Sequence, residues 1–378
     1  MIPIEYDNSK LDEYNAFIDK FLENLDHYLT NGYIGNRKSI KVLEARKFYN
    51  SLSASQKNIF NKSAKPRHWE RLGDNETVLV PLSPMEDNTI AFFTEVKNEL
   101  KDWINYRPNE IKNLSNRIKS SYPDSDDQTS SLYDVIHHMF IENGYEKNGE
   151  PKFPKDKLIE AVGTDVFPHC NRVFIKNREE TIALRKKYGF TRQKILQYSI
   201  ALHHFYDKDK YPYLAILKYN LIPSCPFCNG PTGKHTKNAE DEGLISPFML
   251  EDANAMKFST EITGDGFTNM DTCAKAISLK VNYYEPKMEN NAIVFHLEEL
   301  YKTHTDYAAE IYFRHRMMGS EAYQEFVQKM IGEGSVMSTN DWNRMILGFT
   351  NNPEDLGKKP ISKFCKDLLE DFEDKGIK

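Results

Sequence analysis

The sequence predicts an α+β protein that is mainly helical and carries a small module with strands in its middle. Apolar residues recur at helical spacing in the first and last thirds of the chain, and these are separated by a segment whose apolar pattern suggests strands. With 378 residues, of which 39% are hydrophobic and 12% aromatic, the chain is long enough for two or three domains with packed cores. We therefore expect a helical N-terminal region (1–130), a central module (131–250) and a helical C-terminal region (251–378).

The N-terminal region is predicted to be helical because apolar residues follow one another at three- and four-residue steps from Leu11 to Leu29. Such a stripe is far more often a core face than a binding site. The polar, turn-rich stretch 120–131 is expected to form a linker or an exposed loop. A helical pattern resumes at Leu132, and the stretch 155–161 is typical of another short helix.

Strands are expected in the central module, where apolar and aromatic residues replace the helical spacing. The stretch 173–175 is one candidate, and Tyr198, Ile200 and Leu202 indicate another. From Leu297 onward the helical spacing returns and continues beyond residue 320.

The cysteines favour metal binding over disulfide bonds. The chain has five, an odd number, and two of them form the motif Cys225-Pro226-Phe227-Cys228. No apolar run approaches the roughly 18 residues of a membrane span, and the first residues do not resemble a signal peptide. We therefore expect a protein of a reducing compartment, the cytoplasm, with no membrane partner.

Charge is distributed unevenly along a chain whose formal net charge is −6. The window 167–239 holds thirteen lysines and arginines against four acidic residues. A basic segment in an acidic protein suggests a site for a polyanion, because neutralising phosphates releases counterions. On charge alone, a solvated basic face explains the pattern about as well.

Four residues in this window suit the hydrolysis of a phosphodiester bond: the pair His203-His204, then Asn220, then Asn229. The reaction needs a base for the attacking water and a cation beside the phosphate. Histidine, with an ordinary pKa near ~6.5, is available in its neutral form at cytoplasmic pH. Adjacent residues of a strand point to opposite faces, so both histidines serve one site only where a strand ends or bends.

The stretches Leu202–Leu214 and Asn220–Asn229 resemble the ββα-metal motif of the HNH endonuclease family. The resemblance is closest to the HNH effectors of Septu-type and retron-type anti-phage defence systems, and it extends over about residues 165–248. It implies a small ββα-metal HNH module built from two strands and a helix. The histidine pair would lie on the first strand and Asn229 on the helix.

The resemblance also implies a role for each residue. His204 would be the general base, and His203 and Asn229 would hold a catalytic Mg²⁺ or Mn²⁺. Asn220 would keep the His204 imidazole in its working orientation. Contacts to the phosphate backbone of DNA would come from basic residues nearby: Arg172, Lys208, Lys210 and Lys234.

One departure from the family concerns His203, because relatives usually carry aspartate there. An imidazole in place of a carboxylate should make softer ions such as Mn²⁺, Ni²⁺ and Zn²⁺ better tolerated. The alternative is that His203 is a partly buried, hydrogen-bonded histidine without a catalytic role.

A second departure concerns a structural zinc ion, which relatives hold with four cysteines. Here the upstream pair reads Phe167-Pro168-His169-Cys170, so three thiols remain: Cys170, Cys225 and Cys228. Structural zinc sites nearly always have four ligands. His169 or Cys273 could supply the fourth, or the site could be metal-free, with Phe167 packed where relatives hold zinc.

The leading hypothesis is therefore a metal-dependent HNH endonuclease that cleaves DNA in phage defence, with RNA left open as a substrate. The resemblance implies a separately encoded ATPase as a partner. The alternative is a catalytically silent subunit that binds nucleic acid or acts as a scaffold in a defence complex.

Overall fold

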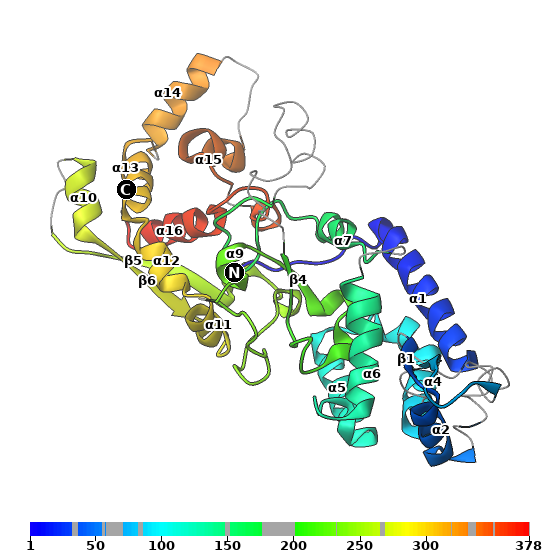
Figure 1. The fold of residues 1–378 in the computed structure, drawn as a ribbon. Coiled ribbons are helices and arrows are strands. Elements are labelled where there is room, and N and C mark those ends of the chain that lie inside the picture. The colour runs from blue at the N-terminus through cyan, green and yellow to red at the C-terminus, as the bar shows by residue number, and fades with distance from the viewer. Residues whose placement is uncertain are drawn as a thin grey trace, which may run out of the picture. The chain divides into compact units, whose positions relative to one another are not determined.

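The computed structural model separates into two compact units, each built from segments that are distant in the sequence (Figure 1). The first unit comprises Met1–Asp7, Ile159–His203 and Ile222–Lys378, and the second comprises Asn8–Leu158 and His204–Leu221. The structure describes the whole chain except residues 32–36, 55–56, 58–70, 82–85, 148–151, 176–200, 232, 265–268, 319, 332–337, 351 and 378.

The second unit is mainly helical, as predicted for the N-terminal region. The helical prediction from Leu11 onward is confirmed by α1 (Asp12–Asn31), whose apolar stripe is buried from Tyr14 to Leu25. A hairpin of β1 (Arg37–Lys41) and β2 (Thr77–Pro81) pairs antiparallel, with Arg37 opposite Pro81. In the part of this unit that the structure describes, further α-helices are α2 (Val42–Ser51), α4 (Asp87–Trp103), α5 (Pro108–Ser121) and α6 (Ser131–His137).

The polar stretch 120–131 contains a short 3-10 turn, Pro123–Ser125, and ends where α6 begins. Ser130 is the N-cap of α6, because its side chain accepts a hydrogen bond from the N–H of Tyr133 at 2.9 Å. The helix then changes to a π-helix over His138–Tyr145, a geometry that is often found at functional sites. The predicted helix at 155–161 is confirmed as α7 (Lys155–Val162).

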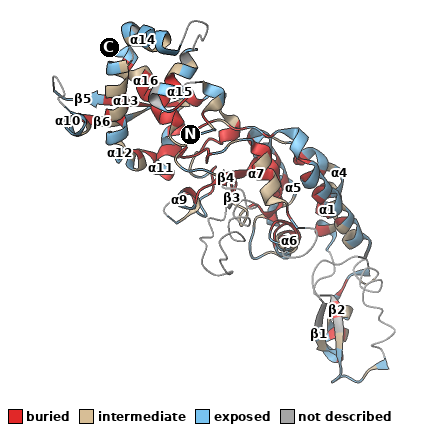
Figure 2. Cartoon of the chain, turned by 90° about the horizontal axis from the view of Figure 1, so that it is seen from above, coloured by how far each residue is buried: buried red, intermediate tan, exposed pale blue. Residues whose placement is uncertain are grey.

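The first unit contains the hairpin of β5 (Met256–Ile262) and β6 (Ile277–Tyr283), against which α16 (Ser362–Asp374) packs (Figure 1). Asp367 and Asp371 of α16 accept backbone N–H bonds from β5. Nine residues of α16 are buried, and Figure 2 shows this helix as a buried element of the core. Among its described residues, this unit also contains the helices α10 (Met270–Ala276), α11 (Met288–Val294), α12 (Leu297–Lys302), α13 (Thr305–Met318), α14 (Glu321–Ile331) and α15 (Thr339–Leu347).

Two short strands, β3 (Ala201–His204) and β4 (Leu221–Ser224), pair with each other and are followed by the one-turn helix α9 (Pro226–Asn229). The histidine pair therefore lies at the end of a first strand, and Asn229 lies on a helix. Of the other expected strands, 173–175 contributes only an isolated bridge between Val166 and Phe174, and Tyr198 and Ile200 fall outside the described residues. Within the described ranges, no helix combines the length and apolar character needed to cross a bilayer.

Candidate functional site

The imidazole of His204 is held by a backbone carbonyl. Its Nε2 atom lies 3.0 Å from the carbonyl oxygen of Ala215, and the side chain is buried with 8% of its surface exposed. A carbonyl oxygen can only accept a hydrogen bond, so Nε2 must carry the proton. In the neutral ring, Nδ1 is then the basic nitrogen, which is the state that a general base requires.

Asn220 fixes the loop that carries this carbonyl. Its Oδ1 accepts the N–H of Tyr206 at 2.7 Å, and its Nδ2 donates to the carbonyls of Tyr206 (3.2 Å) and Leu214 (3.0 Å). Asn220 is fully buried, and its own carbonyl accepts the N–H of Phe205 at 2.8 Å. Asn220 was expected to hold the His204 imidazole, but it binds backbone groups on both sides of the loop instead. The His204 ring is held by the carbonyl of Ala215, the residue after Leu214.

An aromatic side chain that no sequence motif singled out packs against the same imidazole. The ring of Tyr145, the last residue of the π-helix, meets that of His204 edge to face with centroids 4.5 Å apart. On Tyr145, the ammonium of Lys155 lies 3.8 Å from the ring centroid. Burial raises the pKa of the Tyr145 hydroxyl and lowers the pKa of Lys155. No pattern in the sequence predicts the π-helix over 138–145, so sequence reasoning did not identify Tyr145 as a neighbour of His204.

The predicted metal ligands, His203 and Asn229, both lie in the first unit. His203 is 3% exposed, and its ring stacks on that of His169 with centroids 4.7 Å apart. Asn229 is half-buried at the end of α9, where its N–H donates to the carbonyl of Cys225. The cation that His204 and Asn229 would share stays a prediction, because these two residues belong to different units.

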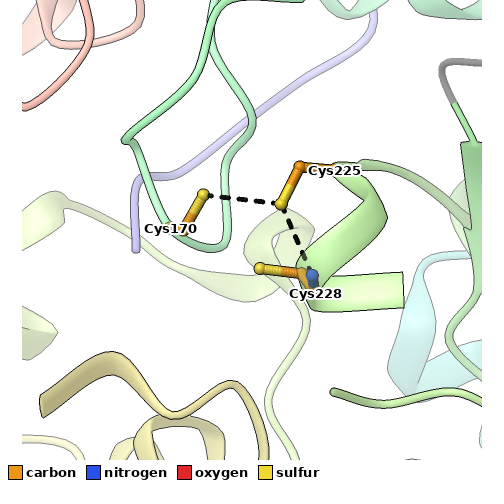
Figure 3. A group of neighbouring side chains, drawn as sticks. All are labelled: Cys170, Cys225 and Cys228. Atoms are coloured by element: carbon orange, nitrogen blue, oxygen red, sulfur yellow. Dashed lines mark hydrogen bonds between the residues drawn. The ribbon is translucent and has the colours of Figure 1, made fainter. Parts of the chain in front are cut away.

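Three cysteines from two separate segments meet in the core of the first unit (Figure 3). The sulfurs of Cys170, Cys225 and Cys228 all lie within 4.8 Å of one another, and the distance from Cys170 to Cys225 is 3.9 Å. All three are buried. Tetrahedral zinc with Zn–S bonds of about 2.3 Å places its sulfurs about 3.8 Å apart, so the spacing suits a thiophilic cation.

Local geometry explains how α9 presents its two cysteines. Cys225 is the N-cap of the helix, and its sulfur accepts the N–H of Cys228 at 3.4 Å. After the helix the chain turns back, and the N–H of Lys234 donates to the carbonyl of Cys228 at 2.9 Å. A Cβ atom on Gly233 would overlap that carbonyl oxygen, so the turn requires glycine there.

The pKa values of the three thiols are shifted in opposite directions. The hydrogen bond with Cys170 lowers the pKa of Cys225 to about 2, while the same contact raises the pKa of Cys170 to about 12. Contacts with both other thiols also raise the pKa of Cys228. Three buried thiolates cannot coexist without a counter-charge, and a divalent cation would supply it.

The position where the family resemblance implies a fourth cysteine is apolar here. Phe167 is 4% exposed and packs in the same buried cluster as the three cysteines. Cys273, on α10, is fully buried in that cluster too, but among the described residues the group of neighbouring metal-ligand atoms includes neither Cys273 nor His169.

The predicted phosphate contacts are mostly engaged within the protein. Lys208 pairs with Glu146 at 2.9 Å, and Arg172 donates to the Nε2 atom of His304 at 3.2 Å. Lys210 lies over the ring of Tyr211, with its ammonium 5.4 Å from the centroid.

Lys234 differs from the other three because only 1% of it is exposed, so it does not offer its ammonium to a ligand on the surface. Seven other basic residues of the window fall at 176–200, outside the described residues.

Comparison with known proteins finds a partial likeness. A 56-residue segment is 39% identical to the Septu protein PtuB of Bacillus thuringiensis, and this segment spans 15% of the chain and 21% of that protein. No family model matches the chain, and no solved structure matches it. Over that segment, the chain is similar to a Septu protein, and it covers about a fifth of that protein's length.

Proposed function

We propose that the protein is a metal-dependent endonuclease of the HNH type that hydrolyses phosphodiester bonds in DNA and acts in anti-phage defence. The observation that carries this proposal is the hydrogen bond from His204 to the carbonyl of Ala215. It holds an imidazole at the end of a strand in the tautomer of a general base. The order strand, strand, short helix, and the likeness to a Septu protein, support it.

In this mechanism Nδ1 of His204 removes a proton from the attacking water. The water oxygen bonds to phosphorus, the P–O3′ bond breaks, and the leaving oxygen takes a proton from solvent. The imidazolium that forms keeps its Nε2–H bond to the Ala215 carbonyl, whose partial negative charge stabilises it. Asn220 serves as a positioning residue, because it ties together the backbone on both sides of the loop.

His203 and Asn229 would hold the catalytic ion, Mg²⁺ or Mn²⁺, whose charge would offset that developing on the phosphate. Their donor set is one imidazole nitrogen and one amide oxygen. Both donors are neutral, and the set suits ions of intermediate softness better than it suits Mg²⁺. We therefore expect activity with Mn²⁺ or Ni²⁺ to exceed activity with Mg²⁺.

A defence role follows from the Septu likeness and would place the nuclease under the control of a partner. We propose a separately encoded ATPase as that partner. The basic window 167–239 would contact the nucleic acid, and its net positive charge predicts that binding weakens as the salt concentration rises.

The test is cleavage of supercoiled plasmid by the full chain with Mg²⁺, Mn²⁺ or Ni²⁺, alone and with the partner ATPase, and with a single-stranded RNA in parallel. We expect nicking by the wild type, at least a hundredfold loss in His204→Ala, and no loss in His27→Ala, which changes an exposed histidine of α1. Equal inertness of wild type and His204→Ala in every combination would overturn the proposal in favour of a silent scaffold subunit.

A further inference from the structure

His169 is a buried imidazole that lacks a hydrogen-bonding partner. It is 1% exposed, and neither Nδ1 nor Nε2 has a hydrogen bond in the structure. Buried polar atoms are nearly always satisfied, and one that is not indicates a water or an ion that completes its surroundings. Two unsatisfied nitrogens on one ring make a missing partner the simplest explanation.

The ring is confined to one place in the core. It stacks on Phe295 with centroids 4.1 Å apart and on His203 at 4.7 Å, so it cannot turn to water without breaking both contacts. Phe295 belongs to the buried cluster that contains the three cysteines. The missing partner must therefore lie inside this core.

The turn that carries His169 also carries the first cysteine. The N–H of Asn171 donates to the carbonyl of Phe167 at 2.8 Å, which closes a tight turn around His169 and Cys170. Asn171 ties this turn to a distant part of the chain. Its side chain accepts the N–H of Lys363 at 3.1 Å and donates to the carbonyl of Leu356 at 3.0 Å. A backbone held this firmly keeps the imidazole beside the cysteine group.

We propose that Cys170, Cys225, Cys228 and His169 together bind one Zn²⁺ ion, with His169 as the fourth ligand. Three sulfurs already lie within 4.8 Å of one another, one pair at 3.9 Å, close to the spacing in a tetrahedral site. Structural zinc takes four ligands, with Cys₃His as one of its usual sets. His169 precedes Cys170 in the same turn, and coordination of the ion by one of its ring nitrogens would supply the partner that this nitrogen lacks. Phe167, at the position of the relatives' cysteine, has no donor atom and fills the space beside the site.

The test is cobalt substitution of the metal-free full chain, followed by absorption spectroscopy. Thiolate-to-cobalt charge-transfer bands report on the cysteine site, and strong d–d bands report four-coordinate, tetrahedral cobalt. We expect one Co²⁺ per chain with both features, displaced by one equivalent of Zn²⁺. His169→Phe keeps the stacked ring without its nitrogens, and it should weaken binding at least tenfold and change the d–d bands.

His169→Cys should restore tight binding with a stronger charge-transfer band, because a fourth thiolate replaces the imidazole. His235→Ala is the matched control, since it alters an exposed histidine close to α9 and should leave the spectrum unchanged. Thermal unfolding in the presence of Zn²⁺ would show that each variant folds.

The proposal is overturned if folded wild type takes up no cobalt at the thiolates, or if His169→Phe matches it in affinity and spectrum. Neither result depends on nuclease activity, so the test is separate from that of the proposed function.

Discussion

The Nε2 atom of His204 lies 3.0 Å from the carbonyl oxygen of Ala215, eleven residues further along the chain. The contact couples the candidate base to a loop rather than to another side chain. Any change that loosens this loop should therefore reduce activity without removing a reacting group.

Asn220→Ala tests this coupling. The substitution leaves the carbonyl of Leu214 and the N–H of Tyr206 without their buried partner, which should cost about 2–4 kcal/mol of stability. We expect plasmid nicking to fall at least tenfold at a temperature where the variant is still folded, because the neighbouring Ala215 carbonyl loses its fixed position. Urea unfolding measures the first effect and nicking the second. Full activity in a destabilised Asn220→Ala would show that the loop does not position the base.

Tyr145 should matter through its ring. Tyr145→Phe retains the edge-to-face contact with His204, and we expect nicking within about threefold of wild type. Tyr145→Leu removes the aromatic contact, worth about 0.5–1.5 kcal/mol, and lets the imidazole turn. We expect the leucine variant to lose more activity than the phenylalanine variant. The idea fails if the two variants have the same activity in a nicking assay.

Replacing His203 with aspartate should change the preferred metal. His203→Asp supplies the carboxylate that the family resemblance leads us to expect at this position, a harder ligand than imidazole. We expect the ratio of nicking with Mg²⁺ to nicking with Ni²⁺ to rise, and taking the ratio within one variant cancels any loss of folded protein. An unchanged ratio would argue that His203 does not bind the catalytic ion.

Gly233→Ala should destabilise the first unit, because the new Cβ would collide with the carbonyl of Cys228. We expect a loss of about 2 kcal/mol or more in the free energy of unfolding. Gly73→Ala is the matched control, since a Cβ there has only an ordinary contact at 3.6 Å with Glu76. Equal melting temperatures for the two variants would contradict the close approach at the cysteine turn.

A buried ion pair on α16 predicts a pH dependence. Lys363 and Asp367 are each 1% exposed in their side chains and lie 2.6 Å apart, and burial lowers the pKa of Lys363 and raises that of Asp367. Lys363→Met leaves the carboxyl unpaired and should cost about 3–5 kcal/mol near neutral pH. A carboxyl whose folded pKa is raised contributes stability at low pH that is lost as the pH rises through that pKa.

The defect of Lys363→Met should therefore shrink as the pH falls toward the ordinary range of a carboxyl. Adding Asp367→Asn should recover part of the loss at neutral pH, because the amide carries no charge to bury. Urea unfolding from pH 4 to pH 8 checks both expectations. A defect that is independent of pH would show that the loss comes from packing alone.

Much of the local structure could be predicted from the sequence. The helix α1, the short helix α7 and the helices after Leu297 follow from apolar spacing, because a periodic stripe specifies its own geometry. The strand under His203-His204 and the cysteine motif at the start of α9 were also predictable, since residue type and spacing carry them. The strand expected at 173–175 was reduced to an isolated bridge, because it has no long partner among the described residues.

What the sequence by itself determined is therefore the helical class of the chain, the identity of its candidate chemistry and the three thiols available to a metal. Only the tertiary structure decided that Ala215 rather than Asn220 holds the imidazole of His204, that Tyr145 packs on it, and that His169 is buried without a partner. Local patterns follow from the period of one helix or strand. Contacts between separate segments depend on how those segments pack together and exclude water, and no short stretch of sequence encodes that.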